Sequence, residues 1–232
     1  MDWGIGRGND NFLGAFLGAL LSLAISIYIE YQRKPKLSFT IEEPPYEGTY
    51  TSAPAKQVRF LRVQLWNQAM PSLLRWLNRD AALHCNGDIQ FHHTEDGTPI
   101  FTRPMPIRWS GSDEPFSLQV APTGTLVSIF DYGKYSAATR RNCYPGNKES
   151  IDVVARFDDE GECYGWSNES YIPNKGWRNI DWKLPTGRFL VTVTVYSAGE
   201  KIVGAFKLEN TAGRSDFRLL PASEQDKRKL GI

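Results

Sequence analysis

The chain has 232 residues, and its 27 Lys and Arg nearly balance its 26 Asp and Glu. Because nucleic-acid-binding proteins rely on a surplus of basic side chains, this balance excludes a broad phosphate-binding surface, and we expect no nucleic-acid partner. The three cysteines, Cys85, Cys143 and Cys163, are an odd number without the spacing of a disulfide framework, which indicates a reducing compartment.

The first predicted element is an apolar run, Phe12 to Ile29, that contains no charged residue. As a helix it would span about 27 Å, close to the hydrocarbon thickness of a bilayer, about 30 Å. The leader before it is not positive, and the run ends in bulky residues rather than in a small-x-small cleavage site, which argues against a signal peptide. The sequence therefore predicts a tail at 1–11, an uncleaved transmembrane helix at 12–29 and a basic linker at 30–36.

A basic cluster directly after the run predicts its orientation. Arg33, Lys34 and Lys36 would remain on the cytoplasmic side, because basic flanks are retained there. We expect a single-pass protein of a prokaryotic inner membrane, with a short N-terminus outside and the rest of the chain in the cytoplasm.

Small residues recur every four positions along the predicted helix, at Gly14, Gly18, Ser22 and Ser26. Helices in lipid associate by close backbone approach, which small residues permit. The alternative is that such residues are simply common in membrane helices. We favour self-association through this face, and hence a homo-oligomer.

Short strands separated by turn signals dominate the remaining chain. The clearest covers 188–199, where alternating apolar residues share one face and a hairpin leads into 201–210. The other expected strands cover 37–42, 57–66, 81–91, 126–130, 151–157, 162–172 and 217–220. This pattern is typical of an immunoglobulin-like or related antiparallel β-sandwich, so we expect a mainly β domain at 37–220 and a charged, frayed tail at 221–232.

Several segments between these strands are expected to be irregular. Residues 71–81 fit either a short helix, with three leucines on one side, or a wide loop. The remaining irregularities are long polar loops at 43–55 and 131–150, a bulge near Leu61 and Arg62, an interruption at Asn86-Gly87, and an edge segment at 98–109 that contains prolines.

No motif in the sequence predicts catalysis or a resident metal. Nucleophile elbows, zinc-protease helices, phosphate loops and dinucleotide fingerprints are all missing from the sequence. His84 and Cys85 are adjacent, as are His92 and His93, and adjacent residues on a strand point to opposite faces, so neither pair can readily chelate an ion together. We expect a protein that is not an enzyme and has no metal or cofactor.

Two groups of side chains are candidates for ligand binding. The first is a polar loop whose basic and amide groups suit bidentate contacts to a phosphate or carboxylate, or contact with the anionic leaflet: Arg140, Arg141, Asn142 and Lys148. The second is Trp177 and Trp182, which occupy a predicted connector and are candidates for an interface or a stacking platform. A solvated loop and buried core aromatics are the alternatives.

These features support three hypotheses about function. The leading one is a non-enzymatic membrane-anchored protein whose β domain binds a protein partner and whose helix self-associates. The second is a ligand-gated membrane effector, in which the β domain senses a small anionic ligand such as a nucleotide and the helix oligomerises to perturb the bilayer. The third has the reversed orientation and binds sugars through Trp177 and Trp182.

Overall fold

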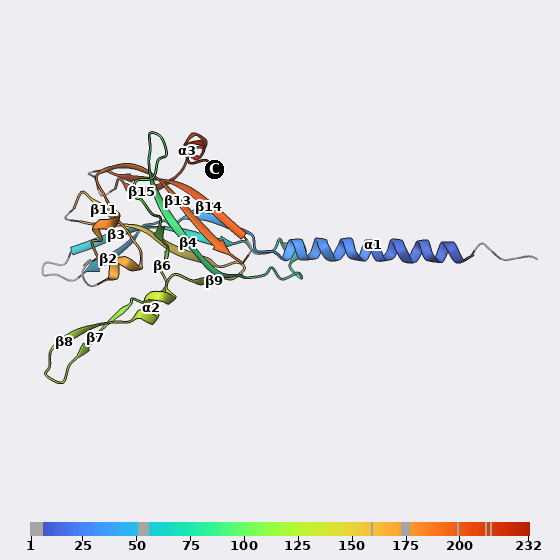
Figure 1. Cartoon of the computed structure of the whole chain (residues 1–232), viewed down its shortest axis with the longest axis horizontal. Coiled ribbons are helices and arrows are strands. Elements are labelled where there is room, and N and C mark those ends of the chain that lie inside the picture. The colour runs from blue at the N-terminus through green and yellow to red at the C-terminus, as the bar shows by residue number, and fades with distance from the viewer. Residues whose placement is uncertain are drawn as a thin grey trace, which may run out of the picture.

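The computed structural model describes residues 7–50, 56–158, 160–172, 177–198, 200–211, 213 and 215–232. A long N-terminal helix, α1 (Arg7–Arg33), extends from a β-rich domain (Figure 1). The helix begins before and ends after the predicted range, because its polar flanks continue the helical backbone beyond the apolar run.

The helix α1 is long and apolar enough to span a membrane. The candidate span, Phe12–Arg33, has a mean hydropathy of 2.2, and none of it is buried against the rest of the described chain. Within the described residues it is the one helix that meets these criteria of length and composition. A core helix of a soluble domain would instead bury much of its apolar surface.

The described residues of the β domain form two main antiparallel sheets. The first has seven strands, with the path β1-β3-β10-β11-β12, while β2 pairs with β3 and β6 with β10. Its strands are β1 (Leu37–Ile41), β2 (Tyr46–Tyr50), β3 (Lys56–Asn67), β6 (Arg108–Trp109), β10 (Lys148–Phe157), β11 (Cys163–Gly165) and β12 (Lys183–Leu184).

The second sheet has six strands, with the path β15-β14-β13-β4-β5 and with β9 paired to β4. Its strands are β4 (Ala82–His93), β5 (Met105–Pro106), β9 (Arg141–Cys143), β13 (Gly187–Ser197), β14 (Glu200–Asn210) and β15 (Phe217–Pro221). The antiparallel β-sandwich predicted from the sequence is confirmed.

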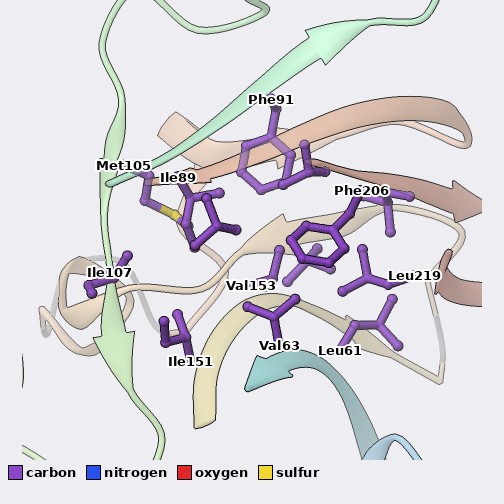
Figure 2. Close-up of a cluster of buried hydrophobic side chains, with 14 of the residues drawn as sticks. Leu61, Val63, Ile89, Phe91, Met105, Ile107, Ile151, Val153, Phe206 and Leu219 are labelled. Carbon is purple, nitrogen blue, oxygen red and sulfur yellow. The ribbon is translucent and has the colours of Figure 1, made fainter. Parts of the chain in front are cut away.

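The main hydrophobic core lies between the two sheets. Val63 and Leu65 of β3 contribute from the first sheet, and Ile89 and Phe91 of β4 contribute from the second; all four are fully buried. Figure 2 shows Val63, Ile89 and Phe91 within this cluster. Burying an aliphatic or aromatic side chain of this size stabilises the fold by about 1.5–3 kcal/mol, so this shared core accounts for the union of the two sheets.

The outer face of the first sheet carries a second apolar cluster. Val58 of β3 and Phe157 of β10 belong to it, while Leu61 belongs to the main core. Both faces of β3 are therefore covered by apolar clusters. Its apolar residues change from even to odd positions because the first ones belong to the outer cluster and the later ones to the main core. The bulge predicted near Leu61 and Arg62 lies at that step of the β3–β10 ladder, where Arg62 pairs with Asp152 and Leu61 with Val154; the extra residue, Val153, belongs to β10 rather than to β3.

Two predicted loops contain regular structure. Strand β2 lies within 43–55 and pairs with β3, although residues 51–55 lie outside the described part of the chain. The segment 131–150 contains α2 (Tyr132–Ala137) and β9. The expectation of long polar loops was therefore wrong in both places, because β2 pairs with β3, β9 pairs with β4, and the side chain of Asp131 caps α2.

Other boundaries also differ from the prediction. Residues 71–81 form a loop with one 3₁₀ turn, η1 (Ser72–Leu74). Strand β4 is not interrupted at Asn86-Gly87; its irregularity is at His84, which has a positive φ of 52°. The tail contains a short capped helix, α3 (Glu224–Lys229), whose Lys229 donates to the carbonyl of Thr94, so it is not simply frayed.

Candidate functional site

A pocket of about 260 Å³ opens on the outer face of the first sheet. Strands β2, β3 and β10 supply its base, and the segments after β6 and β11 supply its rim. Six aromatic side chains line it: Tyr46, Phe60, Phe157, Trp166, Tyr171 and Trp177. Aromatic walls of this kind suit a flat apolar or aromatic group.

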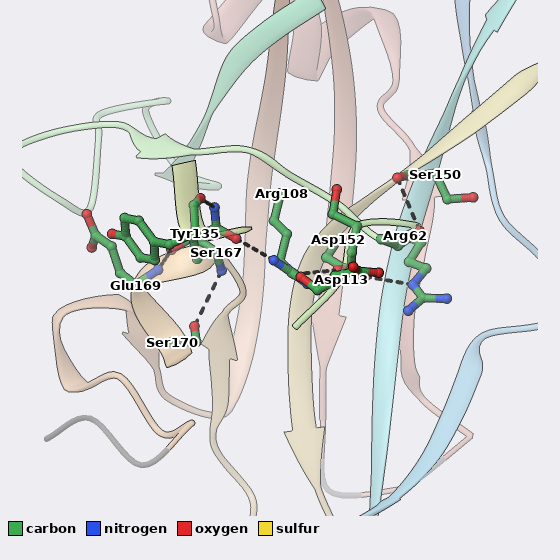
Figure 3. Close-up of polar contacts among 12 residues, drawn as sticks. Arg62, Arg108, Asp113, Tyr135, Ser150, Asp152, Ser167, Glu169 and Ser170 are labelled. Carbon is green, nitrogen blue, oxygen red and sulfur yellow. Dashed lines mark hydrogen bonds and ion pairs between the residues drawn. The ribbon is translucent and has the colours of Figure 1, made fainter. Parts of the chain in front are cut away.

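The floor of this pocket carries an ion cluster from three strands (Figure 3). The Nε of Arg62 donates to Asp152 at 2.7 Å, and the Nε of Arg108 lies 3.9 Å from the other carboxylate oxygen. Arg108 also donates to the side chain of Asn168 and to the carbonyl of Ser112. These partners satisfy most of the donors of Arg108, so this arginine is chiefly structural.

The electrostatics of the floor are nearly balanced. Burial raises the pKa of the Asp152 carboxyl, and the positive charges of Arg62 and Arg108 offset part of that increase. Glu42 lies 3.9 Å from Arg62, and Glu114 lies on the pocket rim. Of these residues Arg62, Arg108, Asp152 and Glu114 line the pocket, and Glu42 lies outside it. Two arginines therefore face two carboxylates, so the pocket is better suited to a planar group than to a bare anion.

Trp177 has a strained backbone, and its side chain connects the pocket to strand β7. Its φ is +65°, a conformation that bulky residues rarely adopt. Its ring is stacked on Phe116 with a centroid separation of 6.3 Å, and Phe116 also contacts Tyr171 at 5.8 Å. Phe116 begins strand β7, so the pocket wall and the base of β7 form one aromatic cluster.

Strands β7 (Phe116–Val120) and β8 (Leu126–Phe130) form a separate two-stranded hairpin, which we call the arm. Figure 1 shows the arm extending away from the sandwich. Val127 and Ile129 alternate along β8 and are each 43% exposed, and Val120 near the tip is 69% exposed. Strand β8 was predicted from the sequence, whereas its partner β7 was not.

The predicted basic loop does not line the pocket. Arg140 is exposed beyond α2, and Arg141 on β9 pairs with Glu149 at 2.9 Å. The side-chain oxygen of Asn142 accepts a hydrogen bond from the backbone of His84. Lys148 begins β10, with its Nζ 6.0 Å from the ring centroid of Trp66. The role of these residues in ligand binding stays a prediction.

The two predicted tryptophans have different environments. Trp177 is partly exposed and lines the pocket, as a stacking residue would. Trp182 is only 1% exposed, and its indole N–H donates to Glu169 at 2.9 Å. Trp182 is therefore packed in the core, and its side chain offers no free face to a ligand in this structure.

The ion cluster on the floor of the pocket was not predicted from the sequence. Arg62, Arg108 and Asp152 are isolated in sequence, and only the pairing of β3, β6 and β10 brings them together. One signal was present: Asp152 interrupts the otherwise apolar start of IDVVARF, and a charge within a buried strand requires a partner. The identity of that partner needed the sheet register.

The described residues contain no group of three or more His, Cys, Asp or Glu side chains placed to hold a metal ion. Comparison of the chain with protein-family models, with curated proteins and with solved structures found no match. The functional argument therefore depends on the pocket, the arm and α1.

Proposed function

We propose that this protein is a non-enzymatic, single-pass membrane protein of a prokaryotic inner membrane, whose cytoplasmic β-sandwich binds a protein partner and whose α1 self-associates. The observation that supports partner binding best is the arm. A two-stranded hairpin is marginal in water on its own, and exposed apolar side chains are commonly covered by a partner. A strand of the partner that pairs with the edge of the arm would cover both its backbone and its aliphatic side chains.

Membrane anchoring is supported by α1, and the orientation is supported by the residues around it. Arg33, Lys34 and Lys36 follow the apolar span directly. Basic flanks of this kind are retained in the cytoplasm. The three cysteines are free and buried, as is usual in a reducing compartment.

Photo-crosslinking in the native host tests the partner hypothesis. A photoreactive residue would replace Ile129 in the arm or, as a matched control, Ile180, which is 73% exposed on a different segment. We expect one defined protein to be captured from position 129 and not from position 180. Replacing Val127 with Asp should then abolish the adduct, because the charge would have to be desolvated in the interface. Equal capture from both positions would contradict the hypothesis.

A second candidate function is the sensing of a small planar ligand in the aromatic pocket. The contact between Trp177 and Phe116 favours it, because a ligand that moves Trp177 would also act on the base of the arm. This would link ligand binding to partner binding, as a ligand-gated effector requires. The nearly balanced charge of the floor directs this candidate toward the base of a nucleotide rather than toward its phosphates.

Thermal-shift measurements on the full-length protein in detergent test this second function. Adenosine and adenosine monophosphate are the probes. We expect both to raise the melting temperature of the unmodified chain and of Arg140→Ala, and neither to do so in Trp177→Ala. A shift that is lost in Arg140→Ala and retained in Trp177→Ala would transfer the site to the basic loop.

A further inference from the structure

The loop between β3 and β4, residues 68–81, is fixed at its base to the end of α1. The backbone N–H of Asp80 donates to the carbonyl of Arg33 at 2.7 Å, and the side chain of Asp80 pairs with the Arg33 guanidinium at 3.1 Å. Arg79 donates from Nη1 to the carbonyl of Lys34 at 2.6 Å. We call residues 68–81 the proximal loop, and Figure 1 shows it extending in the direction of α1.

The tip of the proximal loop exposes large apolar side chains. Leu73 is 85% exposed and Trp76 is 72% exposed, whereas Leu77 is buried and holds the loop against the domain. Within the described chain no side chain covers Leu73 or Trp76. Leaving two large apolar groups in water at one site is unfavourable, and such a patch marks a surface that is covered in the working protein.

The position of the loop along α1 indicates what covers it. The apolar run ends at Ile29, so Arg33 lies about 6 Å further along the helix axis, at the depth of the lipid headgroups. A loop that is hydrogen-bonded to Arg33 and Lys34 therefore begins in the headgroup region. Trp is enriched at this depth, and Leu is favoured slightly deeper, at the boundary with the acyl chains.

Basic side chains accompany the apolar tip. Arg75 and Arg79 line a groove of about 370 Å³ together with Met70 and Leu77. The Nε of Arg79 is buried and has no hydrogen-bond partner among the described residues. A groove lined by both guanidinium groups and apolar side chains matches the phosphate and upper acyl chain of a phospholipid.

We propose that the proximal loop is a second membrane-binding element, in which Leu73 and Trp76 enter the leaflet that α1 leaves while Arg75 and Arg79 contact phospholipid phosphates. The proposal depends on the membrane location proposed above for α1. Two attachment points beside each other would restrict how the β domain tilts on the membrane and would hold the arm at the far end of the domain, away from the lipid.

Depth-dependent fluorescence quenching on the full-length protein tests this arrangement. The native cysteines are buried, so single cysteines can be introduced as Leu73→Cys in the loop, Leu21→Cys in α1 and Val120→Cys in the arm, and labelled with bimane. The protein would be reconstituted in vesicles of phosphatidylcholine and phosphatidylglycerol that carry nitroxides on their acyl chains. We expect strong quenching at positions 21 and 73 and none at position 120.

The outcomes separate this inference from the proposed function. Quenching at position 21 without quenching at position 73 would overturn the second membrane contact and leave α1 as the anchor. No quenching at either position would overturn the membrane location itself, and the inference with it. Crosslinking of position 73 between two copies, without quenching, would assign the loop to an interface between protomers and would also overturn the inference.

The lipid phosphate contact has its own test. In the Leu73→Cys protein, Arg75→Gln should reduce quenching at position 73 in vesicles with phosphatidylglycerol, whereas the matched change Arg228→Gln, at an exposed position of α3 away from the groove, should leave it unchanged. Equal quenching in the two variants would overturn the contact between the arginines and the phosphates.

Discussion

Gly87 of β4 lies too close to the backbone of β13 for any larger residue to take its place without a shift. A Cβ added there would lie 2.0 Å from the carbonyl oxygen of Thr194 on β13, whereas one added at Gly48 on β2 would meet its nearest atoms at 3.5 Å. The first distance is a clash with backbone, and the second is ordinary contact. Gly87 therefore permits close pairing of β4 and β13 and does not interrupt β4.

We accordingly predict different costs for two chemically identical changes. Gly87→Ala should lower the free energy of unfolding by about 1–3 kcal/mol or more, because the strands must separate to admit the methyl group. Gly48→Ala should change it by less than about 0.5 kcal/mol. Urea unfolding of the full-length protein in detergent, followed by tryptophan fluorescence, measures both. Equal losses in the two variants would show that the clash is relieved at no cost.

His92 gives the β domain a specific dependence on pH. Its pKa is below the ordinary value, because desolvation of the half-buried ring disfavours the imidazolium; the hydrogen bond with the carbonyl of Gly97 offsets part of this effect. The unfolded chain therefore takes up this proton at a higher pH than the native protein does. Stability is complete above the ordinary histidine pKa of about 6.5 and is lost as the pH falls below it.

The prediction is that His92→Gln reduces the loss of melting temperature between pH 7.5 and pH 5.5 (roughly one unit either side of the ordinary histidine pKa). Glutamine can keep a polar side chain near Gly97 without gaining a proton. His93→Gln, at an exposed neighbouring position, is the matched control and should retain the full loss. Differential scanning fluorimetry of the full-length protein at the two pH values provides the measurement.

At the scale of the element, α1 presents an open face to whatever surrounds it. A Cβ added at Gly14 or Gly18 would meet no atom within 4 Å. The hydroxyls of Ser22 and Ser26 donate to carbonyls of their own helix, at 2.9 Å each, so they do not need a partner helix to be satisfied. Close contact between two copies would then depend most on the glycines.

We predict that Gly14→Ile combined with Gly18→Ile weakens self-association by about tenfold or more, since two branched side chains would separate the backbones. The matched control is Phe16→Ile combined with Leu20→Ile, which changes the opposite face of the helix. Förster transfer between labelled copies in detergent, measured across a dilution series, gives the dissociation constant. A chain that is monomeric before any change would contradict the oligomer hypothesis directly.

The elements that the sequence predicted well are those with one decisive local signal. The apolar run of α1 and the alternating hairpin of β13 and β14 carry such signals in every residue. Strand β7 also carries a local signal, the alternation of Phe116, Leu118 and Val120, which the sequence analysis missed. Helix α2 and the short strand β9 carry none, because each is held by a partner distant in sequence, as when Asn142 accepts a hydrogen bond from the backbone of His84 across β9 and β4. The ion pair of Arg62 and Asp152 was not predicted for the same reason, because the two residues are neighbours only through the register of β3 and β10.

At the scale of the whole molecule, α1 and the arm extend from the β domain in different directions. The helix α1 leaves one end of the sandwich, the proximal loop is fixed beside it, and the arm extends from the domain away from α1 (Figure 1). A membrane at α1 would therefore leave the arm and the aromatic pocket accessible from the aqueous side. The arm can bind its partner only if the β domain lies in the same compartment as that partner. The orientation of the protein in the membrane is therefore the property to measure.

The last prediction concerns this orientation. A C-terminal fusion to green fluorescent protein should be fluorescent and a C-terminal fusion to alkaline phosphatase inactive, because Arg33, Lys34 and Lys36 retain the domain in the cytoplasm. Each basic residue near an anionic leaflet contributes about 1 kcal/mol. Lys34→Glu combined with Lys36→Glu should therefore lower the ratio of fluorescence to phosphatase activity by roughly tenfold, while the hydrogen bonds between Arg33 and Asp80 remain. The same charge change made far from the helix, at the exposed Lys183 of β12 and Arg228 of α3, should leave the ratio as it was. An active phosphatase on the unmodified chain would place the arm outside the cytoplasm and exclude a cytoplasmic partner.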